Sequence, residues 1–136
     1  KPTMSKNKSF TKVREYLLEL NYHIVFENQD DGIFIIDNEE NGIRNLVIGC
    51  SDPILIMEQH IFNIRSKNEE VYRSLLMKNR DIVHGAFVLD ETGKKVIFRD
   101  TLQIENLDRN ELEASLNSLG LLLSEYSTQI INFSKY

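Results

Sequence analysis

The chain has 136 residues, of which 41% are hydrophobic and 27% are charged, and its net charge at pH 7 is −5. This length fits a single domain, residues 1–136, whose core needs no metal or disulfide to hold it together. The one cysteine, Cys50, excludes an internal disulfide, and no run approaches the roughly 18 apolar residues that cross a bilayer, so we expect no membrane span.

The charge is unevenly distributed along the chain. Five basic residues precede the first acidic residue, Glu15, and the remainder carries 11 basic against 21 acidic residues. An acidic body repels phosphate backbones, so we expect no nucleic-acid partner. We interpret residues 1–8 as a flexible tail, and the lack of an apolar leader predicts a cytoplasmic protein.

The first half of the chain predicts one helix followed by strands. Ser9 is a candidate N-cap, Phe10, Val13 and Leu17 follow at helical spacing, and Asn21 ends the helix. The predicted strands span residues 22–28, 33–36, 43–50 and 54–64. Turn residues separate them, among them Asn41-Gly42 and Asp52-Pro53.

The second half predicts two helices around a hairpin. A helix begins at Asn68 and buries a stripe formed by Val71, Tyr72, Leu75 and Leu76. The hairpin strands span residues 86–89 and 96–102. The order α-β-β-β-β-α-β-β-α has few crossover helices, which predicts an α+β fold with a largely antiparallel sheet backed by helices.

The last predicted helix runs from Leu107 towards the C-terminus as one long element. Asp108 and Glu111 have capping-box spacing at its start. Its apolar residues repeat at heptad spacing, but the flanking positions lack the opposed charges of a coiled coil, so we expect it to lie across the sheet. Gly120 in its middle favours the close approach of another backbone, with a hinge as the alternative.

Few residues in the chain have the types and spacing of a catalytic or metal-binding site. His23, His60 and His84 fall in different predicted elements, without the paired spacing of a metal site. Cys50 could join Asp52 and His60 as a nucleophile, an orienting carboxylate and a base, but nothing adjacent would lower its thiol pKa. We predict no catalytic residues, and a cysteine-dependent enzyme remains the weaker alternative.

A cluster of acidic residues raises the question of calcium binding. Its members are Asp30, Asp31, Asp37, Glu39 and Glu40. They lack the alternate-residue spacing of a calcium loop, and acidic residues in turns are ordinarily solvated. We therefore predict no metal and no cofactor.

The predicted sheet is apolar on both faces. In residues 33–36 and 54–57, every position is apolar, whereas an antiparallel sheet with one wet face alternates apolar and polar residues. Two interpretations remain open: the helices cover both faces, or a second copy or a client polypeptide covers part of one. On the second interpretation the candidate contact residues are Phe34, Ile36, Leu55 and Met57.

These patterns resemble the YbjN-like bacterial proteins, which have a type III secretion chaperone-like fold. The similar segments are residues 31–35, 52–58 and above all 84–102, together with the helix start at 107–114. The resemblance covers residues from Ser9 to the C-terminus. It implies a small cytoplasmic protein that forms homodimers and binds an extended segment of a partner polypeptide, and it supplies no catalytic residues.

The sequence thus predicts a non-enzymatic, chaperone-like or regulatory module that binds a partner polypeptide and is homodimeric. The alternative is a regulator that senses a small ligand in a pocket between helix and sheet.

Overall fold

The structure is a computed structural model that describes residues 2–65 and 69–135. Its elements in chain order are α1 (Pro2–Glu19), β1 (His23–Asn28), β2 (Ile33–Asn38), the short 3-10 helix η1 (Glu39–Asn41), β3 (Ile43–Ser51), β4 (Ile54–Asn63), α2 (Glu69–Asn79), β5 (Ala86–Leu89), β6 (Lys95–Gln103), α3 (Arg109–Glu125) and α4 (Ser127–Lys135). Over these described ranges, the predicted α+β fold is confirmed. None of the helices within them has the length and apolar character needed to cross a bilayer.

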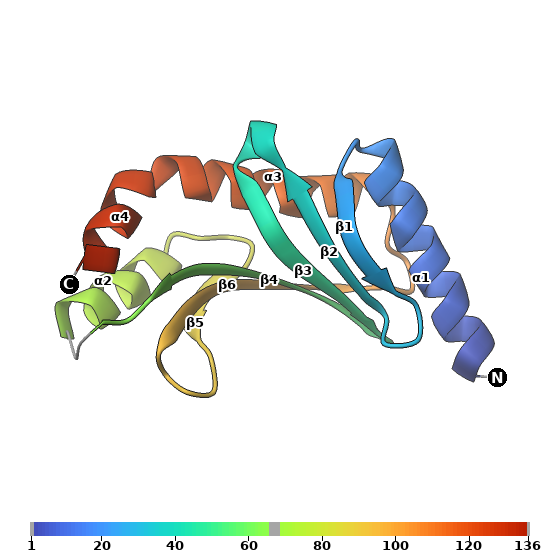
Figure 1. Cartoon of the computed structure of the whole chain (residues 1–136), viewed down its shortest axis with the longest axis horizontal. Coiled ribbons are helices and arrows are strands. Elements are labelled where there is room, and N and C mark those ends of the chain that lie inside the picture. Colours follow the sequence, from blue (N-terminus) through green and yellow to red (C-terminus); the bar gives the residue numbers. More distant parts are fainter. Residues whose placement is uncertain (1, 66–68, 136) are drawn as a thin grey trace.

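The strands form one antiparallel sheet in the order β1-β2-β3-β4-β6-β5. β1 and β5 are its two edges. The sheet is strongly twisted, so that β2 and β3 diverge from β4 and β6, and α3 spans the diverging strands (Figure 1). The predicted antiparallel arrangement is therefore confirmed.

The helices pack against one face of the sheet. The ring of Phe10 in α1 stacks on Phe34 of β2, with centroids 4.1 Å apart. At the other end of the sheet, Phe133 of α4 contacts Phe62 of β4 at a centroid distance of 6.1 Å.

The middle of the same face is covered by α3, and its β5 end by α2. Leu116 of α3 lies beside Met57 of β4 and Phe98 of β6. Leu75 of α2 lies beside Phe87 of β5, which pairs with Phe98. All four α-helices of the described chain therefore lie on one side, and they form a two-layer molecule.

The start of α3 and its glycine at position 120 show how local chemistry sets the position of this helix. The predicted capping box is present: Asp108 Oδ1 accepts from the Glu111 backbone N–H at 2.8 Å, and Glu111 Oε1 accepts from the Asp108 N–H at 3.3 Å. Gly120 brings α3 close to η1, because a Cβ there would lie 3.2 Å from the Asn41 carbonyl oxygen. The predicted close approach of another backbone is confirmed.

Two predictions of helix boundaries differ from the structure. Helix α1 begins at Pro2, so most of the expected tail over residues 1–8 lies in this helix. Ser9 is inside the helix rather than at its N-cap, and its hydroxyl donates to Asp52 Oδ1 at 3.3 Å. The predicted N-cap at Asn68 lies outside the described residues.

The single long C-terminal helix was also expected to be continuous, and it is not. Tyr126 leaves the helical conformation and separates α3 from α4. Ser127 donates its hydroxyl to the Ser124 carbonyl oxygen at this break. The chain changes direction here, as the bend at the left of Figure 1 shows, and Phe133 of α4 contacts Phe62.

Candidate protein-binding surface

The structure places all four predicted contact residues in the hydrophobic core. Phe34, Ile36 and Leu55 are 0% exposed, and Met57 is 4% exposed. They point towards the helices, so they are inaccessible to a partner in this structure. The candidate contact surface therefore lies on the opposite side of the same strands.

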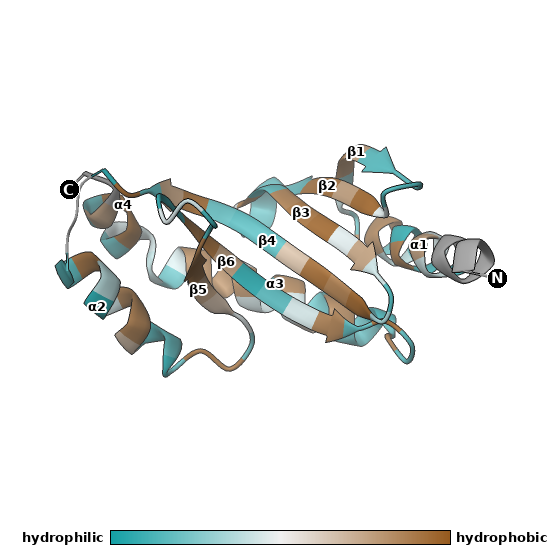
Figure 2. Ribbon diagram, turned by 90° about the horizontal axis from the view of Figure 1, so that it is seen from below, coloured by the Kyte–Doolittle hydropathy of each residue, from teal (hydrophilic) through white to brown (hydrophobic). Residues whose placement is uncertain are grey.

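Neighbouring residues in these strands form the face that no helix covers. Adjacent side chains on a strand alternate between faces, so Ile33 and Ile35 point away from the helices, as do Ile54 and Ile56. Figure 2 views the sheet from this side, with α3 behind it and apolar segments along β2, β3 and β4.

Strand register joins these side chains into continuous rows. Phe26, Ile35 and Val47 form one row across β1, β2 and β3, and Ile33, Gly49 and Ile56 form the next. We call this set the open face; its members are Phe26, Ile33, Ile35, Val47, Gly49, Ile54 and Ile56. Phe26 is 49% exposed and Val47 is 37% exposed, so the face offers large apolar side chains to a partner.

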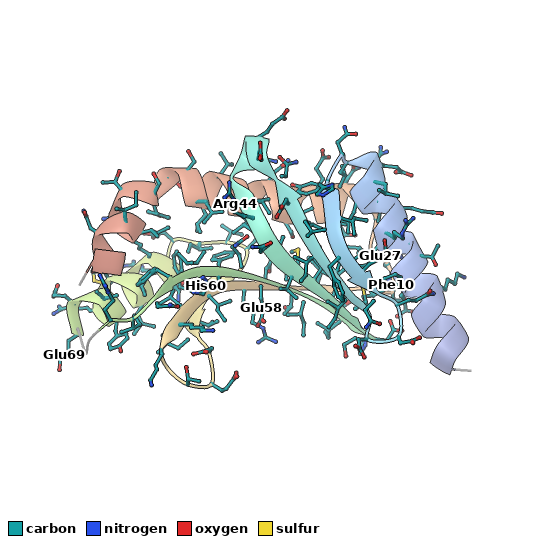
Figure 3. All side chains as sticks on the ribbon, in the orientation of Figure 1. Phe10, Glu27, Arg44, Glu58, His60 and Glu69 are labelled. Atoms are coloured by element: carbon teal, nitrogen blue, oxygen red, sulfur yellow. The ribbon has the colours of Figure 1, made fainter. Side chains whose placement is uncertain are left out.

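The centre of the open face is indented. A Cβ added at Gly49 would meet no atom within 4 Å, so the row between Ile33 and Ile56 has a gap where a partner side chain can enter. The face then becomes polar towards β6. There Glu58 and Arg99 pair at 3.4 Å, and Glu58 points away from α3 (Figure 3).

One edge of the sheet is sealed. The Asn79 side chain of α2 donates to the Phe87 carbonyl oxygen at 3.1 Å and accepts from the Phe87 N–H at 2.8 Å. It therefore bonds both backbone groups that Phe87 of β5 would otherwise present to an added strand. Sealing an edge in this way prevents pairing with another chain.

The opposite edge, β1, has no such seal. Within residues 2–65 and 69–135, no side chain bonds the β1 backbone, and its only regular partner is β2. Val25 is an extra residue in a bulge between Ile24 and Phe26 and is 48% exposed. A free strand edge and the apolar open face thus adjoin each other at Phe26.

A second exposed apolar surface lies between α2 and β5. It is a groove of about 280 Å³ lined by Tyr72, Leu75, Leu76, Phe87, Val88, Leu89 and Val96. Leu76 was predicted to be buried, but it is 71% exposed at the rim of this groove, and Met77 beside it is 65% exposed. Residues 75–77 are all apolar, and three consecutive residues of a helix cannot all lie on one buried stripe. This run was the signal in the sequence for an exposed apolar surface.

The structure places Cys50 and His60, the nucleophile and base of the alternative cysteine-dependent enzyme, on opposite faces of the sheet. Cys50 lies on the helix-covered face and is 4% exposed, whereas His60 is exposed on the other face. Burial, with a smaller contribution from the Asp52 carboxylate, raises the pKa of the Cys50 thiol to about 12. A thiol in this state is a poor nucleophile.

Two of the clustered acidic residues have structural partners. Asp31 accepts from Asn28 at 3.0 Å, and Asp37 accepts from the Asn45 N–H at 2.7 Å. No group of three or more His, Cys, Asp or Glu residues that could hold a metal ion occurs in the part of the chain that the structure describes.

The chain is similar to a known protein family and to several solved structures. A family model described as CesT_Tir_1, a type III secretion chaperone family, matches residues 6–136. No curated protein sequence matches the chain.

Several solved structures share the fold. YbjN from E. coli has a TM-score of 0.69 and 14% identity, over 88% of this chain and 92% of that one. The HopA1–SchA chaperone–effector complex has a TM-score of 0.65 and 14% identity, over 98% of each chain. The heterodimeric ExoU–SpcU complex from the type III secretion system of Pseudomonas aeruginosa has a TM-score of 0.65 and 13% identity, over 88% of this chain and 95% of that one.

Proposed function

The chain belongs to the CesT_Tir_1 family, and we propose that it is a non-enzymatic, chaperone-like protein that binds an extended segment of a partner polypeptide. The observation that carries this proposal is the apolar open face next to an unsealed strand edge. Relatives of the same fold support it, because solved complexes such as HopA1–SchA pair a chaperone with its effector.

The partner segment adds as a strand to β1. Strand addition uses backbone hydrogen bonds for affinity and alternate side chains for specificity. The β1 edge is six residues long, His23–Asn28, and β5 is the less suitable edge because Asn79 bonds both outer backbone groups of Phe87.

Side chains of the partner segment cover the open face. A strand beside β1 directs every second side chain onto Phe26, and the partner residues that continue beyond this strand cross the open face over Ile35 and Val47. Fully burying one large apolar side chain contributes about 1.5–3 kcal/mol, so covering Phe26 and Val47 supplies a useful part of the binding free energy. The gap at Gly49 receives one partner side chain.

The proposal extends to the assembly and its location. Residues 1–136 form one domain that works as a cytoplasmic homodimer, and the subunits join through a surface other than β1. A light-scattering mass of one chain at micromolar concentration would overturn the dimer but would leave the binding of a partner segment to be judged separately.

The test of binding compares matched surface variants. Partners are captured on the immobilised chain from its native cell extract, identified by mass spectrometry, and their segments titrated as synthetic peptides. We expect Phe26→Asp and Val47→Asp to raise the peptide Kd at least about tenfold, because each places a charge on the buried side of the complex. Leu121→Asp is the control, since Leu121 is 70% exposed on α3.

The outcome is decided by the difference between the variants. Circular dichroism and melting temperature first establish that all three fold like the wild type. Equal Kd values for Val47→Asp, Phe26→Asp and Leu121→Asp would show that the partner binds elsewhere and would overturn the proposed surface.

A further inference from the structure

We propose that Asn41 is a deamidation site, that the packing of η1 against α3 restrains the reaction in the folded chain, and that the product loosens this packing. The dipeptide Asn41-Gly42 occupies the connection between β2 and β3, and it is the one Asn-Gly pair in the chain. The inference does not rest on the proposed binding of a partner segment.

The chemistry of the site is attack on the Asn41 side chain by the next backbone nitrogen. The Gly42 nitrogen forms a bond to Cγ of Asn41, the Cγ–Nδ2 bond breaks, and Nδ2 leaves as ammonia with the proton that the Gly42 nitrogen gives up. Water then opens the resulting cyclic imide. Opening at Cγ gives aspartate, whereas opening at the main-chain carbonyl gives isoaspartate, whose backbone passes through Cβ and Cγ. Glycine favours the attack because it has no Cβ to block the approach.

The surroundings of Gly42 leave room for the cyclic imide. Gly42 is exposed, with φ at +70°, and a Cβ built on it would meet no atom within 4 Å. Asp31-Gly32 is the other pair that could form such a ring, but Gly32 is buried. A Cβ there would lie 2.5 Å from the Cys50 carbonyl oxygen, and the Gly32 carbonyl oxygen accepts from the Cys50 N–H at 2.7 Å. The structure therefore favours the reaction at Asn41 over the reaction at Asp31.

In the folded chain, hydrogen bonds of η1 hold both groups that react. The Gly42 N–H donates to the Glu39 carbonyl oxygen at 3.0 Å, and Nδ2 of Asn41 donates to the Tyr22 hydroxyl oxygen at 3.4 Å. The Asn41 N–H donates to Oδ1 of Asn38 at 3.2 Å. These bonds belong to a helix of only three residues, so the opening of a single turn releases them. We expect the rate of deamidation to follow that opening.

The product changes the contact between η1 and α3. A Cβ at Gly120 would lie 3.2 Å from both the carbonyl oxygen and Cβ of Asn41, so the two segments are already tightly packed. Isoaspartate adds a methylene group to the backbone at this contact. Both products exchange a neutral amide, which donates to Tyr22, for a carboxylate that cannot donate.

The new carboxylate also enters an acidic hollow between η1 and α3. This hollow, of about 720 Å³, has four acidic residues among those that line it, Asp37, Glu39, Glu40 and Glu113, and no lysine or arginine of the described chain lines it. Like charges at such short range repel one another. We therefore expect η1 to move away from α3 in either product.

Peptide mapping by mass spectrometry tests the site. The full chain is incubated at neutral pH, either folded or in urea, and each asparagine is examined for conversion of the amide to the acid. We expect conversion at Asn41 in both samples, and at least about tenfold more slowly in the folded one, because opening of η1 limits it. Asn110, which Glu111 follows, is the internal control. Conversion in urea that is no faster at Asn41 than at Asn110, or equal rates at Asn41 in the two samples, would overturn the proposal.

Gly120→Ala tests whether the packing against α3 supplies the restraint. The added Cβ presses on Asn41, so we expect conversion at Asn41 in the folded variant to accelerate by at least about threefold. Asn110→Ala places the same side chain at an exposed position of α3 and should leave the rate unchanged. Circular dichroism checks that both variants are folded. An unchanged rate in folded Gly120→Ala would overturn the restraint by α3.

Asn41→Asp reproduces one product and tests its effect on the fold. We expect its melting temperature to fall by about 3 °C or more, with faster hydrogen–deuterium exchange in residues 117–124 of α3. Asn41→Ser removes the amide without adding a charge, so it should show a smaller change in both measurements. If Asn41→Asp matched the wild type in melting temperature and exchange, the proposed loosening would be wrong.

Discussion

At the scale of single residues, the faces of the strands decide what each side chain can do. Phe34 and Ile35 are neighbours of equal apolarity, yet one is completely buried in the core and the other belongs to the open face. The sequence of β2 alone cannot tell them apart. Strand β3 distinguishes the two faces, since Leu46 and Ile48 alternate with Val47 and Gly49, and cross-strand pairing carries that difference to β2.

The candidate contact residues could therefore have been placed only with the strand register. Phe34 pairs with Ile48, and Ile36 pairs with Leu46. Residues paired across antiparallel strands share a face, so both belong with the more apolar side of β3. Predicting that register requires the bulges in β1 and near Ile36, which no local pattern marks.

Cys50 supplies a prediction about reactivity. Its thiol pKa of about 12 lies about three units above the unperturbed value of 9.0, so the thiolate fraction at pH 7 is about a thousandfold lower than in an unfolded peptide. Iodoacetamide should label the native chain more slowly by about that factor. Labelling at the rate of a free cysteine peptide would show that Cys50 is accessible and would revive the enzyme alternative.

The same group makes stability depend on alkaline pH. The unfolded thiol loses its proton near pH 9 while the native thiol keeps it, so stability is complete below pH 9 and falls as the pH rises towards 12. Burial also raises the pKa of the Tyr22 hydroxyl, and this acts in the same direction. We expect urea unfolding to show a loss of about 1 kcal/mol between pH 8 and pH 10, and Cys50→Ala to lose less. An equal loss in the two proteins would contradict this assignment.

At the scale of elements, the features that depend on neighbouring residues in the sequence were predicted, and those that depend on tertiary contacts were not. The strands and the capping box of α3 were predicted from the sequence, because turn residues and N-cap spacing are local. The break between α3 and α4 was not, since Tyr126 fits the apolar repeat of a continuous helix and Ser127 takes a flanking position in it. The contact of Phe133 with Phe62 accompanies the bend, and a contact so distant in sequence is invisible to helical periodicity.

Asn79 provides a prediction for the sealed edge. Asn79→Ala removes two hydrogen bonds to Phe87 and should lower the free energy of unfolding by about 1–3 kcal/mol. Urea denaturation measures the change, with Asn110→Ala, an exposed substitution on α3, as the control. Equal stability of the two variants would mean that the edge is not sealed by this side chain.

At the scale of the whole molecule, the two surfaces lie at opposite ends of one sheet. All the helices of the described chain pack on one face, which leaves the other face open and bounded by β1. The groove beside α2 lies at the β5 end. A contact at this groove and the proposed strand addition at β1 can therefore occur together.

The central claim is that a partner segment adds to β1 and covers the open face. Hydrogen–deuterium exchange of the chain with and without a captured partner peptide tests it most directly, because amides on a free strand edge exchange until they acquire a partner. We predict slower exchange in residues 23–28 of the complex and no change in residues 86–89. Protection confined to residues 86–89, or absent from residues 23–28, would contradict the account.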